Sequence, residues 1–160
     1  MHAGWCALSR NRLLLASIAA ICVLSASSAS AAPSCTISTT SVNFGNYNVF
    51  GGAPTDSTGT ITFNCKGNAN NIVITLSKGG SATYNPRTML KSGEALNYNL
   101  FQDAARTSIW GDGSGGTSTY TNANPANNTD INVTVYGRVP IGQDVSAGAY
   151  SDTVSAVINF

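Results

Sequence analysis

The chain has 160 residues, only 9% of which are charged, and its formal net charge is +1. This composition excludes the concentrated basic patch that nucleic-acid binding requires, and no polybasic run is present that would favour binding to a membrane surface. Gly, Ser, Thr and Asn are abundant, which is typical of an extracellular β-protein with many turns.

A secretory signal peptide is predicted over residues 1–31. Arg10 and Arg12 form its positively charged start, residues 13–24 are apolar, and Ala29-Ser30-Ala31 is a cleavage site of the A-x-A type. A membrane anchor is the alternative, but the apolar run is shorter than the roughly 20 residues that a membrane span needs. We therefore expect export through the periplasm to the cell surface.

Cleavage after Ala31 leaves one mature domain, residues 32–160, which is long enough for a single hydrophobic core. Six basic side chains then stand against seven acidic ones, a net charge of −1. Two of the four cysteines lie in the leader, so Cys35 and Cys65 remain. In an oxidising compartment they are predicted to form a disulfide, which closes a loop of about 30 residues and contributes roughly 3–4 kcal/mol in the chain-entropy model. Two free thiols are the alternative.

Alternating apolar residues predict six or seven short strands in the mature domain and no helix of useful length. The predicted strands cover residues 35–37 with an extended continuation at 42–45, then 60–65, 72–76, 87–90, 96–100, 131–135 and 150–160. A long polar loop is expected over 111–128. This spacing favours an antiparallel β-sandwich, and a closed barrel is the competing architecture.

The last eleven residues, 150–160, are the most informative segment. Its apolar residues share one face at period two, and Asp152 is the only polar residue on that face; the apolar set is Tyr150, Val154, Ala156, Ile158 and Phe160. An apolar strand at a chain end has a row of unpaired N–H and C=O groups, which folded proteins usually cover. We therefore expect a strand from a partner protein to pair with it.

The mature domain offers little catalytic chemistry. The single histidine, His2, lies in the leader, which excludes Ser-His-Asp and Cys-His catalysis and a histidine zinc site. The acidic residues are scattered, so no spacing favours a glycosidase pair. Asp112 begins a Gly-rich turn that lacks the acidic spacing of a calcium-binding EF-hand. We expect no enzymatic activity, no metal and no cofactor.

Four aromatic residues lie in or near predicted loops: Tyr47, Phe50, Trp110 and Tyr120. Trp110 and Tyr120 are candidates for contact with a glycan or another surface, because exposed rings stack on sugars. The alternative is that these rings cap the two ends of the core.

Nearly all of the mature chain resembles the spore coat protein U domain family, the fold of pilins in archaic chaperone–usher fimbriae. The ordered segments that carry the resemblance are 35–37, 42–45, 61–65, 76–80, 87–90, 96–103, 109–111, 135–140 and 147–154, with a closing Phe160. The resemblance implies an incomplete immunoglobulin-like sandwich that lacks its last strand. It also implies a periplasmic chaperone that lends a strand, and an outer-membrane usher at which another pilin subunit replaces that strand.

The same resemblance implies where the incoming strand binds. The groove would lie between the first and last strands and would be lined by Ile37, Val154, Ala156, Ile158 and Phe160. The Cys35–Cys65 disulfide would tie the first two strands together beside it.

The chain departs from the family pattern at its mature start. Only Ala32, Pro33 and Ser34 precede Cys35, and three residues span about 10 Å, too short for a donor strand. Pro33 also lacks an N–H for strand pairing. We expect a subunit that accepts a strand without donating one, at a fibre tip or as a minor or coat subunit, supporting adhesion or biofilm formation. The alternatives are a self-contained coat protein and a carbohydrate- or surface-binding module.

Overall fold

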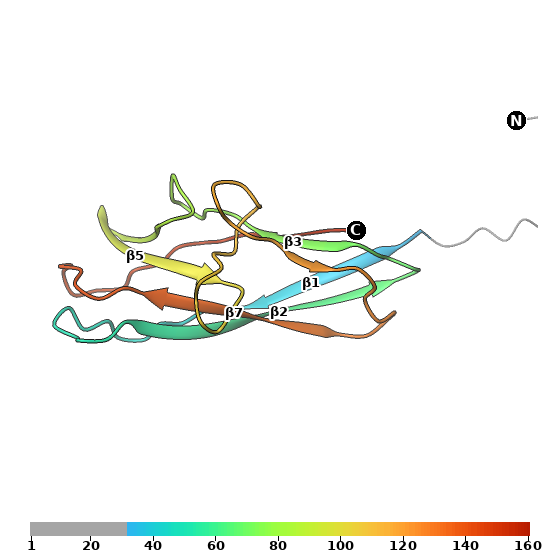
Figure 1. Cartoon of the computed structure of the whole chain (residues 1–160). Coiled ribbons are helices and arrows are strands. Elements are labelled where there is room, and N and C mark those ends of the chain that lie inside the picture. The colour runs from blue at the N-terminus through green and yellow to red at the C-terminus, as the bar shows by residue number, and fades with distance from the viewer. Residues whose placement is uncertain (1–31) are drawn as a thin grey trace, which may run out of the picture.

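The computed structural model describes residues 32–160, and this part of the chain contains eight β-strands and no helix (Figure 1). The predicted signal peptide, residues 1–31, lies outside the described residues. Within residues 32–160 there is accordingly no helix that is long and apolar enough to cross a membrane. The predicted all-β class is confirmed.

The strands form two antiparallel sheets. The larger sheet has the order β1-β2-β7-β5-β4, with bounds β1 Ser34–Thr40, β2 Thr55–Lys66, β7 Ile131–Val139, β5 Glu94–Phe101 and β4 Arg87–Lys91. The smaller sheet has the order β6-β3-β8, with bounds β6 Tyr120–Asn122, β3 Ile72–Leu76 and β8 Ala156–Asn159. Figure 1 shows the two sheets as layers of an elongated sandwich, and the antiparallel sandwich prediction is confirmed.

The core lies between the two sheets and follows the alternation of the sequence. Every second residue is buried in β3 and in the second half of β2, and four residues of β5 are buried as well. The buried apolar residues of these strands are Ile61, Phe63, Cys65, Ile72, Ile74, Leu76, Leu96, Tyr98 and Leu100. Period-two burial of this kind places one face of each strand in the core and the other toward solvent.

Strand β6 was not expected, because residues 120–122 lie in the segment predicted as a long polar loop. Tyr120 of β6 pairs with Ile74 of β3 and packs edge-on against Phe63 at a centroid distance of 6.1 Å. These partners are distant in sequence, so only tertiary contacts make this short segment a strand.

The segment 150–160 is less regular than the single strand predicted there. Ser151 forms an isolated antiparallel bridge with Leu90 of β4, and Ser155 accepts a hydrogen bond from the Ser77 N–H at 2.9 Å. Regular strand geometry begins only at Ala156, where β8 pairs with β3. The last segment therefore passes from the edge of the larger sheet to the edge of the smaller one.

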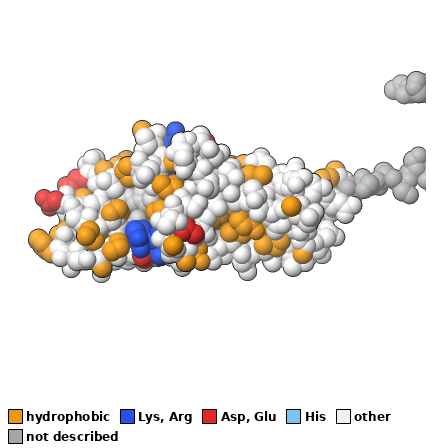
Figure 2. All heavy atoms as spheres, viewed as in Figure 1, with side chains coloured by type: hydrophobic (Ala, Val, Ile, Leu, Met, Phe, Trp, Pro, Cys, Tyr) orange, Lys and Arg blue, Asp and Glu red, His pale blue; other side chains and the backbone are white. Residues whose placement is uncertain are grey.

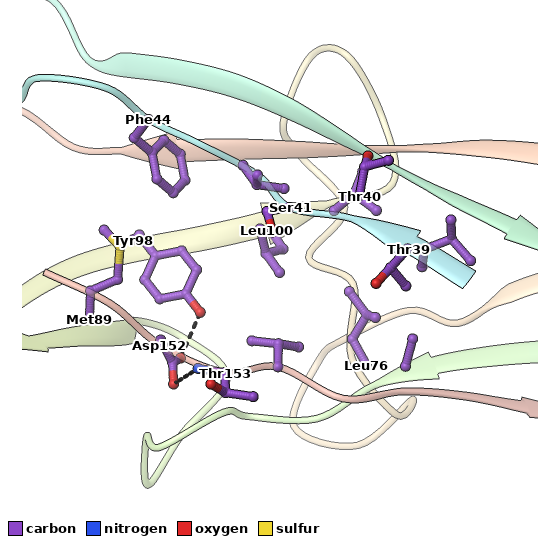
Figure 3. A pocket seen from close by; sticks show the side chains of 15 residues that line it. Thr39, Thr40, Ser41, Phe44, Leu76, Met89, Tyr98, Leu100, Asp152 and Thr153 are labelled. Atoms are coloured by element: carbon purple, nitrogen blue, oxygen red, sulfur yellow. Dashed lines mark hydrogen bonds between the residues drawn. The ribbon is translucent and has the colours of Figure 1, made fainter. Parts of the chain in front are cut away.

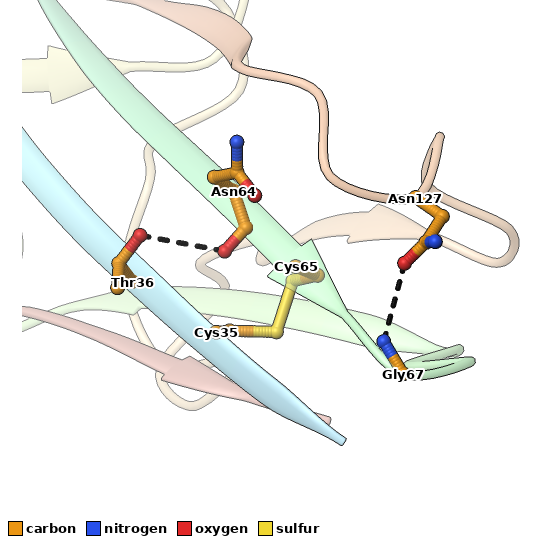
Figure 4. Close-up of a disulfide and its surroundings, with 6 residues drawn as sticks. All are labelled: Cys35, Thr36, Asn64, Cys65, Gly67 and Asn127. Atoms are coloured by element: carbon orange, nitrogen blue, oxygen red, sulfur yellow. Dashed lines mark hydrogen bonds between the residues drawn. A yellow bond between two sulfur atoms is a disulfide. The ribbon is translucent and has the colours of Figure 1, made fainter. Parts of the chain in front are cut away.

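The Cys35–Cys65 disulfide is present, as predicted, and the alternative of two free thiols is wrong for this structure (Figure 4). The two cysteines are direct cross-strand partners in a ladder that runs from Ser34 opposite Lys66 to Thr40 opposite Thr60. The bond therefore joins β1 to β2, the one strand with which β1 pairs in the described chain.

Two glycines allow the segment after β1 to cross the larger sheet closely. A Cβ atom on Gly59 of β2 would lie 2.8 Å from the Thr40 carbonyl oxygen. A Cβ atom on Gly137 of β7 would lie 2.6 Å from Val42 Cγ1 and 2.7 Å from Phe44 Cζ. Real Cβ atoms do not approach other atoms so closely, so a side chain at Gly59 would force the backbone at Thr40 to shift, and one at Gly137 would force the Val42 and Phe44 side chains to shift.

We predict that Gly137→Ala lowers the free energy of unfolding by about 1–3 kcal/mol, because the added methyl group overpacks the contact with Val42 and Phe44. Gly52→Ala is the matched control, since a Cβ at Gly52 meets no atom within 4 Å. Urea unfolding of both variants measures the difference, and equal midpoints for Gly137→Ala and the parent would refute the close crossing.

Candidate functional site

One side of the sandwich is left open by two strand edges without a partner. Among residues 32–160, β1 pairs only with β2, and β8 pairs only with β3. Strand β1 begins and the chain ends at the same end of the molecule, so the two edges run in opposite directions along this side (Figure 1). Both edges present backbone N–H and C=O groups that have no ladder partner.

A hollow of about 300 Å³ lies between these two edges (Figure 3). One wall consists of β1 and the residues after it, and the other consists of the segment that leads into β8. The lining residues of the two walls are Thr39, Thr40, Ser41, Val42 and Phe44 on one side and Asp152, Thr153, Val154 and Ala156 on the other. This position makes the hollow part of a groove that runs between the first and last strands.

The floor of the hollow is apolar and belongs to the core. It is formed by Ile61, Leu76, Met89, Tyr98, Leu100 and Val135. A strand laid along the groove would cover these side chains and remove apolar surface from water, which is favourable by roughly 25 cal/mol per Å².

The alternation of buried and exposed residues along β1 also shows which side of the sandwich lacks a covering strand. Cys35 and Ile37 are half-buried and pack against the core. Thr39 has the same phase in the strand but is exposed, and it lines the hollow. An inward-facing residue is exposed here because no strand covers it.

The structure brings two of the five predicted groove residues to the hollow. Val154 and Ala156 line it, whereas Ile37 and Ile158 are half-buried and pack against the core beyond its lining. Phe160 is 52% exposed at the chain end. The sequence prediction missed the lining residues Thr39, Ser41, Val42, Phe44 and Asp152. The one sequence feature that could have identified a lining residue is the spacing of Thr39, which follows Cys35 and Ile37 at intervals of two and therefore lies on the same face of the strand.

Trp110 corrects one prediction, because its side chain is 0% exposed and cannot contact a ligand. Its Nε1–H donates to the Ile74 carbonyl oxygen at 3.0 Å. Tyr120 is half-buried and lies 6.1 Å from the Trp110 ring. Both rings close the core, as the alternative interpretation had it. Phe50, in contrast, has a solvent-exposed side chain, with 94% of its surface accessible.

Asp152 places a carboxylate in the wall of the hollow. Its Oδ1 accepts the N–H groups of Gly80 and Thr153, both at 2.8 Å, and its Oδ2 accepts the Tyr98 hydroxyl at 2.7 Å (Figure 3). Burial raises the pKa of Tyr98, and the hydrogen bond to Asp152 raises it further. The Tyr98 hydroxyl therefore keeps its proton and acts as a donor at neutral pH.

Arg87 is fully buried and holds the base of the same wall. Its guanidinium donates to the Ser77 carbonyl oxygen at 3.0 and 3.1 Å, to Asn99 Oδ1 at 2.8 Å and to the Trp110 carbonyl oxygen at 2.7 Å. Ser77 in turn accepts the Ser155 N–H at its Oγ. Burial lowers the pKa of Arg87, and these four bonds satisfy the buried group.

Across residues 32–160, no three His, Cys, Asp or Glu side chains gather in a way that would hold a metal ion. The groove therefore offers backbone hydrogen-bonding groups, an apolar floor and one carboxylate. Such a surface is suited to binding an extended polypeptide.

Comparison with known proteins assigns the family. The model of the Spore Coat Protein U domain matches residues 20–157. The chain belongs to this family. Protein U of Myxococcus xanthus is 33% identical over 132 residues, which cover 74% of this chain and 71% of that protein. The family match begins before Ala32, the predicted mature start.

A solved structure supports the fold. The chain is similar to one chain of the CsuC–CsuE chaperone–tip adhesion subunit pre-assembly complex from the archaic chaperone–usher Csu pili of Acinetobacter baumannii, with a TM-score of 0.57 and 24% identity. The similarity covers 81% of this chain and 40% of that chain. The chain thus shares the fold over less than half of its structural neighbour's length.

We predict that Trp110→Ala lowers the free energy of unfolding by about 3–5 kcal/mol, because it removes a buried ring and leaves a cavity. Phe50→Ala should change it by less than about 0.5 kcal/mol, since Phe50 is almost fully exposed. Urea unfolding compares the two. A Trp110→Ala variant as stable as Phe50→Ala would contradict the buried position of Trp110.

Proposed function

We propose that this protein is an exported structural subunit of a chaperone–usher surface fibre, and that a strand from another polypeptide completes its sandwich. The observation that carries the proposal is the apolar-floored hollow between the unpaired edges of β1 and β8. Strand addition at a sheet edge uses backbone hydrogen bonds for affinity and alternate side chains for specificity.

The inserted strand would satisfy both edges together. Its N–H and C=O groups would pair with β1 on one side and with β8 on the other, and its inward side chains would enter the hollow. Seven residues of β1 span about 23 Å at strand geometry, so a partner segment of similar length fits. Covering the edges also removes an aggregation hazard, because open edges pair with other chains.

The partner would change during assembly. A periplasmic chaperone would lend the first strand, and at an outer-membrane usher a neighbouring subunit would supply the permanent one. The family membership and the chaperone–subunit complex among the similar structures support this order. The proposed place of the finished subunit is the cell surface, with a structural rather than an enzymatic role.

The predicted cleavage after Ala31 supports a position at the fibre tip or at another end of an assembly. Three residues before Cys35 cannot fill a groove of this length. Cleavage nearer Ala20 would leave a longer extension, rich in Ser and Ala, that would be a weak donor. The mass of the mature protein separates these two cases.

A surface-binding module is the second candidate function, and the exposure of Phe50 favours it. This residue belongs to the loop between β1 and β2, which lies at the left end of the molecule in Figure 1. Figure 2 shows hydrophobic side chains at this end of the molecule, with acidic side chains beside them. Adhesion through this loop is compatible with a role in a fibre.

Co-expression of the tagged full-length chain with its periplasmic chaperone, followed by intact-mass analysis, tests the proposal. We expect a stable complex with the chaperone and a subunit mass that begins at Ala32. A soluble monomer that unfolds cooperatively without any chaperone would overturn the proposal and would indicate a self-contained coat protein.

We predict that Ile158→Asp lowers the yield of the chaperone complex by about tenfold or more, because an inward-facing carboxylate would be buried without a partner. Val157→Asp is the matched control on the same strand, since Val157 points outward and is 51% exposed. Pull-down of the tagged subunit measures both yields. Equal losses for the two variants would show that the inward face of β8 is not the binding surface.

A further inference from the structure

The groove wall changes from apolar to charged at Asp152. Val154 and Ala156 share the inward phase with Asp152, and all three line the hollow. Asp152 lies four residues before Ala156, which is about 13 Å along an extended chain. An inserted strand that places one side chain opposite Ala156 therefore places the side chain four residues away opposite Asp152.

Asp152 retains hydrogen-bonding capacity. A carboxylate offers about four acceptor positions, and Asp152 uses two at Oδ1, for Gly80 and Thr153, and one at Oδ2, for Tyr98. One position at Oδ2 remains for a group within the hollow. The side chain is only half-buried, so water reaches it while the groove is open.

The carboxylate is held in place by its surroundings. A Cβ atom on Gly79 would overlap it, so the Gly79-Gly80 turn packs directly against the carboxylate group. No Lys or Arg of the described chain lines the hollow. The nearby Arg87 donates its hydrogen bonds to Ser77, Asn99 and Trp110 instead. The Asp152 carboxylate is therefore held in place, and its hydrogen bonds come from Tyr98 and two backbone N–H groups rather than from a basic side chain.

A strand that fills the groove displaces the water that serves the open acceptor position. Asp152 would then be buried with one acceptor position unfilled, which is unfavourable, whereas a hydrogen bond to a charged group contributes about 1.5–3 kcal/mol. Thr153, which follows Asp152 directly, adds a second polar side chain at this end of the hollow (Figure 3). An apolar side chain opposite Asp152 would be disfavoured on both counts.

We infer that the strand that a neighbouring fibre subunit supplies to this groove carries, opposite Asp152, a side chain that donates a hydrogen bond. Four residues along the same strand it carries an apolar side chain opposite Ala156. This inference rests on the proposed function and names the chemistry of the partner strand. The carboxylate thereby selects among incoming strands that are otherwise equally apolar.

Strand exchange from the chaperone complex of the full mature chain tests the inference. The probes are synthetic 15-residue peptides with alternating Val, in which each inward position is replaced in turn by Lys or by norleucine. The readout is the rate of transfer of the subunit from chaperone to peptide, followed by native electrophoresis and mass spectrometry. At one position we expect Lys to be favoured over norleucine by about tenfold.

Asp152→Asn should abolish that preference, because the amide has no charge and can itself donate a hydrogen bond. Tyr98→Phe should strengthen it, because a second acceptor position on Oδ2 becomes free; this variant also tests the inference if Asp152→Asn does not fold. The control is Asp144→Asn, an exposed acidic residue outside the hollow, which should leave the preference unchanged.

Two results would overturn the inference while leaving the proposed function intact. One is peptide transfer with the same Lys-to-norleucine ratio in the parent and in Asp152→Asn. The other is an Asp152→Asn variant that changes capture by the chaperone but not the choice of peptide, which would assign the carboxylate to the chaperone strand. Failure of every peptide to enter the groove would overturn the proposed function, and the inference with it.

Discussion

The missing backbone partner between β1 and β8 is the constraint on which the rest of this structure depends. Each edge strand has one neighbour in the described chain, and their free edges lie on either side of a hollow whose floor is the hydrophobic core. Backbone N–H and C=O groups need partners, and an apolar floor favours being covered. These two requirements act at the same place and are satisfied together by one extended segment.

The two walls of the groove are held in different ways. Strand β1 is joined to β2 by a complete ladder and by the Cys35–Cys65 disulfide, which keeps it beside the groove while its outer edge is empty. The opposite wall depends on polar contacts. Arg87 holds Ser77, Ser77 holds Ser155, and Asp152 joins Gly80 to Tyr98. These bonds, two of them part-buried and two exposed, give the last segment a defined path before β8 begins.

Because the protein carries few charged residues, the single carboxylate in the groove has a large effect on which strands can bind there. Only 9% of the residues are charged, and the surface in Figure 2 is correspondingly poor in ionic groups. Where strands compete for one apolar groove, alternate apolar residues alone discriminate weakly. A fixed carboxylate at one end adds a penalty against strands that cannot pair with it, and such penalties are an effective source of specificity.

Much of the fold could be predicted from local patterns, because period-two alternation reports directly which face of a strand is buried. It identified the all-β class and the strands around Phe63, Ile74 and Tyr98. The Cys35–Cys65 pair followed instead from the two cysteines that remain after the predicted cleavage, and the groove residues Val154 and Ala156 were implied by the family resemblance. Alternation failed for Trp110 and for β6, since the burial of an aromatic residue in a polar segment depends on partners such as Ile74 and Phe63 that are distant in sequence. The sequence by itself determined that Asp152 shares a face with Val154 and Ala156, because alternate residues of a strand point the same way. Only the tertiary structure decided that this face borders a hollow opposite β1, and that Gly80 and Tyr98 come from other segments to hold the Asp152 carboxylate there.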